Sequence, residues 1–308
     1  MSEISRDTGP DGPVPAGAEP PAPLSSAPKK PRLWSAFAVA ILGFPAAILF
    51  AIVVVVIYAL AVYGIHAAAD PNFAKNLPRD PAVLVVIVVA MEVGIGLAVL
   101  VPALLSPEPW YRRLGLVAFP GYGAKLPVLM LATFAVNFLL TVTLPHFVGE
   151  PSDYLMPLIQ AFFESGVLSR LALIIAITVI AGFAEEIFFR GYFQRRLLQR
   201  WPVWLAIGVA SVFFAIAHGS LSYAAYVFPL GVWLGVVAWR TGSVWCSTAC
   251  HAFNNLVGVL MLYVNSSATA EAELPLPIEI GLVIVALGIL AWGIVALRRP
   301  AASAQTSA

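Results

Sequence analysis

Long apolar runs are the feature that most restricts what this 308-residue chain can fold into. Most of them reach the ~17–25 residues that a helix needs to cross the apolar core of a bilayer. The chain is 60% hydrophobic and 11% charged, whereas soluble domains are about 45–50% apolar and about 25% charged. The sequence therefore predicts an all-α fold, a polytopic membrane helix bundle with about eight transmembrane helices. The predicted spans are Trp34–Ile65, Ala82–Leu105, Leu126–Leu144, Leu168–Phe189, Val203–Ala217, Tyr223–Trp239, Val244–Val264 and Ile278–Leu297.

The basic residues test this number of spans, because the cytoplasmic loops of membrane proteins carry an excess of Lys and Arg. With eight spans and the N-terminus inside, the outer segments hold only Lys75, Arg79 and Arg170. We therefore expect an integral membrane protein with both termini in the cytoplasm. The basic inner loops suit a bacterial inner (cell) membrane, and an endoplasmic reticulum location would give a similar pattern. The apolar composition predicts the lipid bilayer as a partner, and a net charge of +1 without a basic patch predicts no nucleic-acid partner.

Ionisable side chains interrupt the end of the fourth apolar run, at Glu185, Glu186 and Arg190. A charge at the centre of a membrane helix costs about 2.5–3.5 kcal/mol on insertion scales, so such residues indicate a functional site. Glu186 and Arg190 are four residues apart and can pair on one helix face. Glu185 lies about 100° further round the helix. We therefore expect Glu186 and Arg190 to support the helix and Glu185 to be available for chemistry.

Polar residues in two later spans are predicted to lie at a similar depth. Glu185 and His218 stand at almost equal distances along the chain from Pro202, where the chain reverses, so an antiparallel helical hairpin brings them level. His251 and Asn255 are four residues apart and share one face of the seventh span. Three segments therefore bring a carboxylate, two imidazoles and an amide together.

This set of side chains suits hydrolysis by activated water. A carboxylate beside an imidazole, here Glu185 and His218, can take a proton from water and deliver hydroxide to a carbonyl carbon. A second imidazole and an amide, here His251 and Asn255, can donate hydrogen bonds to the oxyanion that forms. His218, His251 and Glu185 could equally hold Zn²⁺ with one position open for water. No Ser, Thr or Cys stands beside a base at helical spacing, so a side-chain nucleophile is not expected.

The motifs resemble those of the CPBP family, intramembrane proteases that include the eukaryotic CAAX prenyl endopeptidase and bacterial Abi and bacteriocin-processing homologues. The resemblance implies an eight-helix bundle in which Glu185 and His218 activate water while His251 and Asn255 stabilise the oxyanion. The family has been interpreted both as zinc metalloproteases and as metal-free glutamate proteases, and the sequence leaves both open. The motifs that carry the resemblance are Glu185-Glu186-x-x-x-Arg190, Phe214-x-x-x-His218 and His251-x-x-x-Asn255.

The motifs and the composition divide the chain into five predicted parts. Residues 1–30, rich in Pro, Gly, Ala and Ser, are expected to form a disordered tail, and so are residues 300–308. Residues 31–167 hold the first three spans, and residues 168–265 form the core that carries the motifs. Residues 266–299 hold the last span.

The favoured function is an intramembrane endopeptidase acting on membrane-embedded or lipidated peptides. The alternative is a catalytically silent membrane scaffold or a bacteriocin-immunity-type protein that keeps the fold. A proton-coupled transporter that uses Glu185, Glu92 and the histidines as a relay is a third hypothesis, which the lack of paired broken segments disfavours. Phe214 is predicted to line the cavity as a wall. The motifs do not explain Glu92, which lies deep in the second span.

Overall fold

The computed structural model is helical throughout the part of the chain that it describes, as predicted. The expected tails, 1–30 and 300–308, lie outside that part. The described residues are 33–65, 72–73, 77, 80–149, 159–160, 162–267 and 275–298. The helices that span or cross the bundle are α1 (Leu33–Tyr63), α3 (Pro81–Leu104), α5 (Leu126–Thr143), α8 (Val167–Ile175), η4 (Ala176–Ala181), α9 (Gly182–Glu186), η5 (Ile187–Gln194), α10 (Arg195–Leu198), α11 (Val203–Ile216), α12 (Leu221–Thr241), α13 (Val244–Ser267) and α14 (Leu276–Ala296). The short helices are α4 (Trp110–Arg113), η3 (Gly123–Lys125) and α6 (Pro145–Val148).

The predicted number of eight spans is not confirmed. Within the described residues, six helical stretches are long and apolar enough to cross a membrane. Two of the predicted spans are not among them. α11 has only 14 residues, and α13, with 24 residues, carries the polar side chains of His251, Asn254 and Asn255. The six stretches, together with the large apolar side chains exposed on α1 and α14, are those of an integral membrane protein.

The fourth span runs without a break from α8 to α10, over 32 residues. It is not a uniform α-helix, because η4 and η5 are π-helical turns on either side of α9. A π-helix bonds each N–H to the fifth preceding carbonyl and is often found at functional sites. The sequence predicted one regular helix here. The side chains after each π-helical turn therefore point in other directions than they would on one regular α-helix.

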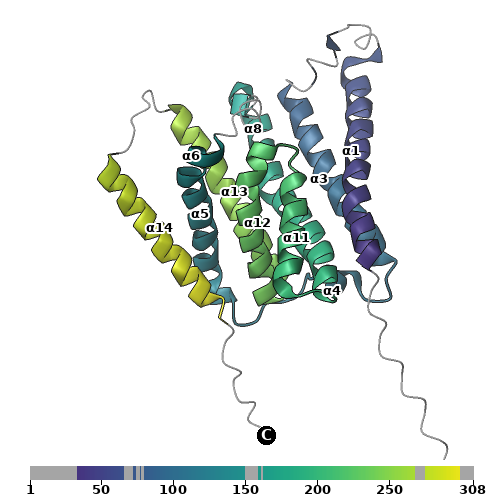
Figure 1. Ribbon diagram of the computed structural model, residues 1–308. Helices are drawn as coiled ribbons and strands as arrows, with labels where there is room; N and C mark the ends of the chain where they lie inside the picture. Colours follow the sequence, from purple (N-terminus) through teal and green to yellow (C-terminus); the bar gives the residue numbers. More distant parts are fainter. Residues whose placement is uncertain are drawn as a thin grey trace, which may run out of the picture. The chain divides into compact units, whose positions relative to one another are not determined.

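Two large groups of buried side chains, beside a smaller one around Leu173, hold the bundle together. The first surrounds η5, where Phe188 packs edge-on against Phe44 of α1 and Phe193 packs in the same way against Phe37. The second lies between α5, α12, α13 and α14. Figure 1 shows α1 and α3 at one side of the bundle and α14 beside α5 at the other. The fourth span and its neighbours α11, α12 and α13 lie between them.

Asp80 ties the start of α3 to the end of α1. One of its carboxylate oxygens accepts a hydrogen bond from the backbone N–H of Ala82, as an N-cap does, and the other accepts one from the hydroxyl of Tyr63. The Tyr63 hydrogen bond holds the pKa of Asp80 below its usual range. The ionised carboxylate therefore stabilises this connection at neutral pH, and the stabilisation is lost as the pH falls through the lowered pKa.

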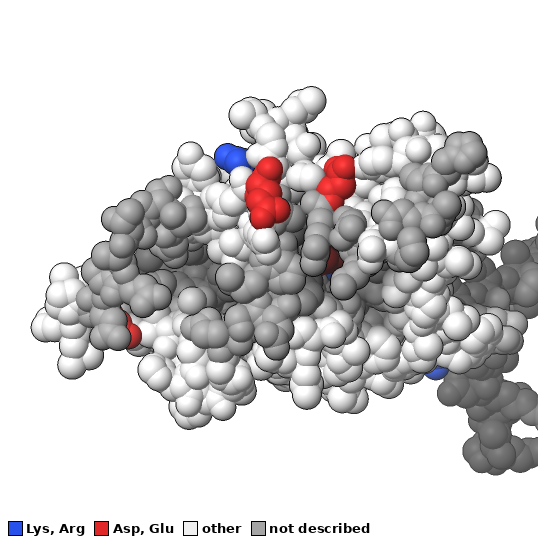
Figure 2. Space-filling view, turned by 90° about the horizontal axis from the view of Figure 1, so that it is seen from above, with Lys and Arg blue, Asp and Glu red and all other residues white. Residues whose placement is uncertain are grey.

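Figure 2 views the molecule from above. Among the described residues on this face charged side chains are few, and acidic ones are more conspicuous than basic ones. The sequence predicts few basic residues at the outer face, because basic residues collect in the cytoplasmic loops. The orientation in the membrane stays a prediction.

The packing of α14 on α5 yields a test of the bundle. A Cβ at Gly293 would lie 2.4 Å from Cβ of Ala132, which has no freedom to move aside. We expect Gly293→Ala to lower the stability by about 1–3 kcal/mol, as overpacking does. Gly288 lies on the same helix, and a Cβ there would meet nothing within 4 Å. Thermal unfolding in detergent should therefore show a lower Tm for Gly293→Ala and no loss for Gly288→Ala. Equal Tm values would contradict this packing.

Candidate active site

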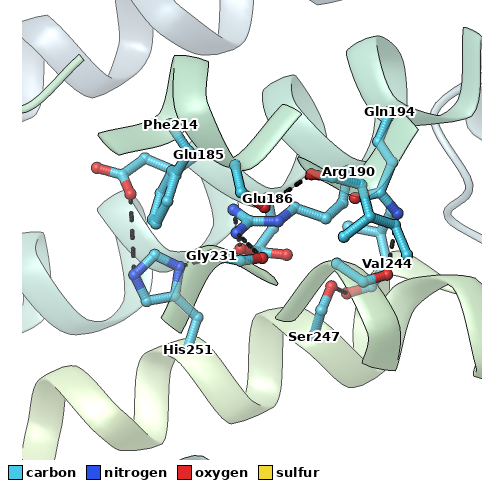
Figure 3. A network of polar contacts seen from close by, with 12 residues as sticks. Glu185, Glu186, Arg190, Gln194, Phe214, Gly231, Val244, Ser247 and His251 are labelled. Carbon is cyan, nitrogen blue, oxygen red and sulfur yellow. Dashed lines mark hydrogen bonds and ion pairs between the residues drawn. The ribbon is translucent and has the colours of Figure 1, made fainter. Parts of the chain in front are cut away.

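A buried ion pair lies at the centre of the candidate site. The Arg190 guanidinium donates from Nη1 to Oε1 of Glu186 at 2.8 Å, and both side chains are almost completely buried. The ion pair that the spacing of the two residues predicts is therefore formed. Arg190 also donates from Nη2 to the backbone carbonyl of Gly231 on α12, at 3.0 Å. Figure 3 shows this cation between the fourth span and α12.

Phe214 connects the ion pair to the two histidines. Its ring centroid lies 4.2 Å from the guanidinium carbon of Arg190, a cation–π distance. The rings of His218 and His251 pack edge-on against it, with centroids at 5.1 Å and 5.8 Å. Phe214 is only 1% exposed. It therefore sets the spacing between the cation and both imidazoles.

His251 lies between two carboxylates. Its Nδ1 is 3.2 Å from Oε1 of Glu186, and its Nε2 is 3.8 Å from Oε2 of Glu185 (Figure 3). Because a carboxylate can only accept, Nδ1 carries the hydrogen that is donated to Glu186. The distance from Nε2 to Glu185 is too long for a direct hydrogen bond. The sequence paired Glu185 with His218, and the structure adds His251 as a neighbour of that carboxylate.

His218 and Glu185 line one cavity, as the hairpin argument predicts. The cavity has a volume of about 230 Å³, which is room for several water molecules. Nδ1 of His218 lies 2.9 Å from the carbonyl oxygen of Phe214. This carbonyl can only accept, so in the neutral imidazole Nδ1 carries the hydrogen and Nε2 keeps its lone pair. The other residues of the lining are Phe44, Met91, Glu92, Ile95, Phe189 and Ala217.

Asn255 is held on the first π-helical turn. Its side-chain N–H donates to the carbonyl oxygen of Ile177 in η4, at 3.0 Å. Asn255 lies one helical turn beyond His251 on α13, and it is not part of the lining of the cavity that holds Glu185 and His218. One donor of the amide is therefore occupied by the backbone. The other N–H is the one that could serve an oxyanion.

Zinc binding by His218, His251 and Glu185 stays a prediction. Among the residues that the structure describes, no group of three His, Cys, Asp or Glu side chains is gathered as around a metal ion. Nδ1 of His251 faces Glu186, and Nδ1 of His218 faces a backbone carbonyl, so Nε2 is the nitrogen of each ring that could bind a metal.

Two contacts of the site were not anticipated from the sequence. Gln194 follows Arg190 by one turn and donates to the carbonyl oxygen of Gly235 at 2.9 Å, just as Arg190 donates to Gly231. A Cβ at Gly235 would lie 2.7 Å from Oε1 of Gln194, so the small residue permits the contact. The sequence feature that could have indicated these contacts is the pair Gly231 and Gly235, because glycines four residues apart in an apolar run are typical of close helix packing in membranes.

The buried ion pair can be tested by a double substitution. Arg190→Met leaves Glu186 as an uncompensated buried charge, so we expect a loss of about 3–5 kcal/mol of stability. Adding Glu186→Gln removes that charge and should recover part of the loss, because the amide oxygen still accepts from His251. Thermal unfolding of both variants checks this. Arg195→Met is the matched control, since Arg195 donates only to backbone carbonyls at 3.2–3.4 Å. A double variant less stable than Arg190→Met would contradict the pairing.

Comparison with known families supports the resemblance read from the motifs. Residues 167–257 match the model of a family described as type II CAAX prenyl endopeptidase Rce1-like. The predicted resemblance to CAAX-type proteases is thereby confirmed for this segment, and the match is consistent with the CPBP family. The matched segment begins with α8 and includes every motif residue, whereas Glu92 lies outside it. No curated protein and no solved structure matches the chain. The family's description is that of a CAAX-type endopeptidase, and the match covers residues 167–257, less than half of the chain.

Proposed function

We propose that this chain, whose residues 167–257 match the Rce1-like family, is an intramembrane endopeptidase that uses water activated by Glu185 and His218. The observation that carries the proposal is the shared cavity. It places a carboxylate and an imidazole with a free Nε2 lone pair on one cavity that has room for several water molecules, within an apolar bundle. A silent scaffold would gain nothing from burying these groups together, because each costs free energy in a membrane.

Glu185 and His218 divide the activation of water in this proposal. Nε2 of His218 accepts one hydrogen bond from a cavity water and orients it, while the Glu185 carboxylate takes the proton. The hydroxide then forms a bond to the carbonyl carbon of the peptide. Because Nδ1 of His218 donates to the carbonyl of Phe214, the ring is held in the tautomer that this role needs.

His251 and Asn255 are proposed to stabilise the oxyanion. Glu186 fixes the ring of His251 by accepting a hydrogen bond from Nδ1. Nε2 can then donate to the oxyanion when both ring nitrogens carry a hydrogen. Asn255 retains one amide N–H beside its bond to Ile177. Donors that are held in place before the reaction lower the barrier more than mobile ones, because they need no reorganisation. Glu186 and Arg190 therefore act as positioning residues.

The proposed substrate is a prenylated peptide ending in Cys-aliphatic-aliphatic-X, the sequence that prenylation marks. Support comes from the description of the matching family as a CAAX prenyl endopeptidase and from the cavity among the helices of the bundle. We propose that the chain lies in a bacterial inner membrane with both termini inside, because the basic residues of the sequence collect on that side.

Cleavage of a farnesylated CAAX peptide in lipid vesicles tests the function. We expect Glu185→Gln and His218→Ala each to lower the cleavage rate by about 10²–10⁴-fold, the size of a lost general-base contribution. Glu279→Gln makes the same chemical change on α14, which packs against α5, and should leave the rate unchanged. Mass spectrometry of the products gives the rate and the cleaved bond. If the wild type does not cleave the peptide, the scaffold alternative is the better one. If both site variants cleave like the wild type, Glu185 and His218 do not activate the water.

The mechanism is proposed to proceed without a bound metal. The support is the geometry of the side chains, which does not bring three ligands together in the described residues. We therefore expect full cleavage activity after incubation with a strong chelator and removal of bound ions by dialysis. Metal analysis of the same sample is the control. Loss of activity that added Zn²⁺ restores would show that the ligands rearrange around a metal.

A further inference from the structure

The second span contributes an ionisable group to the same cavity. Glu92 of α3 lines it together with Glu185 and His218, and only 8% of Glu92 is exposed. It lies outside the matched segment, and the motifs assign it nothing. α3 packs directly against α9 and η5, so Glu92 stands opposite the diglutamate segment.

The surroundings of Glu92 do not explain it as a structural residue. A buried carboxylate that serves packing is normally paired or hydrogen-bonded. Oε2 of Glu92 is buried and has no hydrogen-bond partner among the described residues. The other carboxyl group on the same cavity is Glu185, and two negative charges on one cavity repel each other. A buried carboxyl group without a cationic partner is more stable in its protonated form, and that form can donate its proton.

The reaction needs such a donor. Peptide hydrolysis must put a proton on the leaving nitrogen, because an amide anion is too poor a leaving group to depart unprotonated. Pairs of carboxyl groups in different surroundings can serve as base and acid in one reaction. Glu185 is the proposed base. Glu92 is the carboxyl group that remains on the same cavity.

We propose that Glu92 is a further catalytic residue, the general acid that protonates the leaving nitrogen; this rests on the proposed function. The Glu185 carboxylate takes a proton from water as the new C–O bond forms. The carboxylic acid of Glu92 gives its proton to the nitrogen as the C–N bond breaks. Glu185 then returns the proton to Glu92 through cavity water. One water and one peptide bond become a carboxylic acid and an amine, and the enzyme is restored.

Two substrates that differ in one atom test this role. The first is the farnesylated CAAX peptide, and the second is its depsipeptide, in which oxygen replaces the scissile N–H. An alkoxide departs from the tetrahedral intermediate far more readily than an amide anion, so the depsipeptide needs a general acid much less. Glu92→Gln should therefore lower kcat on the peptide by about 10²–10³-fold and on the depsipeptide only a few-fold. Glu279→Gln, the matched control, should cleave both like the wild type.

The outcomes separate the two proposals. Glu185→Gln should lose cleavage activity on both substrates, because both reactions need activated water. If this variant cleaves the peptide normally, the proposed function fails. The general-acid role is overturned if Glu92→Gln lowers kcat equally on both substrates while its Tm is unchanged. It is also overturned if this variant cleaves the peptide like the wild type. If Glu92→Gln does not fold, Glu92→Asp replaces it, since it keeps the acid on a shorter side chain. It should then be impaired on the peptide and near normal on the depsipeptide, and equal losses overturn the role.

Discussion

The buried ion pair of Arg190 and Glu186 is the interaction on which the candidate site depends. Two charges withdrawn from water are tolerated only when nearly every polar atom finds a partner. Arg190 meets this need with Glu186, the carbonyl of Gly231 and the face of Phe214, and Glu186 in turn accepts from His251. One cation thus links the fourth span to α11, α12 and α13. Helices that could otherwise slide in an apolar bundle are held in one register.

The π-helical turns on either side of α9 place the diglutamate segment. A π-helical turn adds a residue to the helix and leaves a backbone carbonyl free for another partner. The Ile177 carbonyl in η4 takes the side-chain amide of Asn255. The second turn, η5, carries Arg190 and Gln194, which both donate to glycine carbonyls of α12. The irregular helix and the polar contacts therefore support each other, because each supplies partners that the other lacks.

The cavity is completed by helices outside the segment that matches the Rce1-like family. That segment supplies Glu185, Phe189, Ala217 and His218, whereas α1 and α3 supply the remaining walls and Glu92. The first two spans are therefore more than anchors in the bilayer. They exclude lipid from one side of the polar groups, and they add a third ionisable side chain to the cavity. The chemistry of the site is a property of the whole bundle.

The sequence by itself determined the helical class, the membrane character, the pairing of Glu186 with Arg190 and the common depth of Glu185 and His218. These follow from the length of apolar runs and from spacing along one helix or one hairpin, which are local. Only the tertiary structure decided the π-helical turns, the position of His251 between two carboxylates, the bond of Asn255 to Ile177 and the presence of Glu92 in the cavity. Each of these depends on how distant helices rotate and pack against one another, and helical periodicity carries no information about a neighbour's rotation.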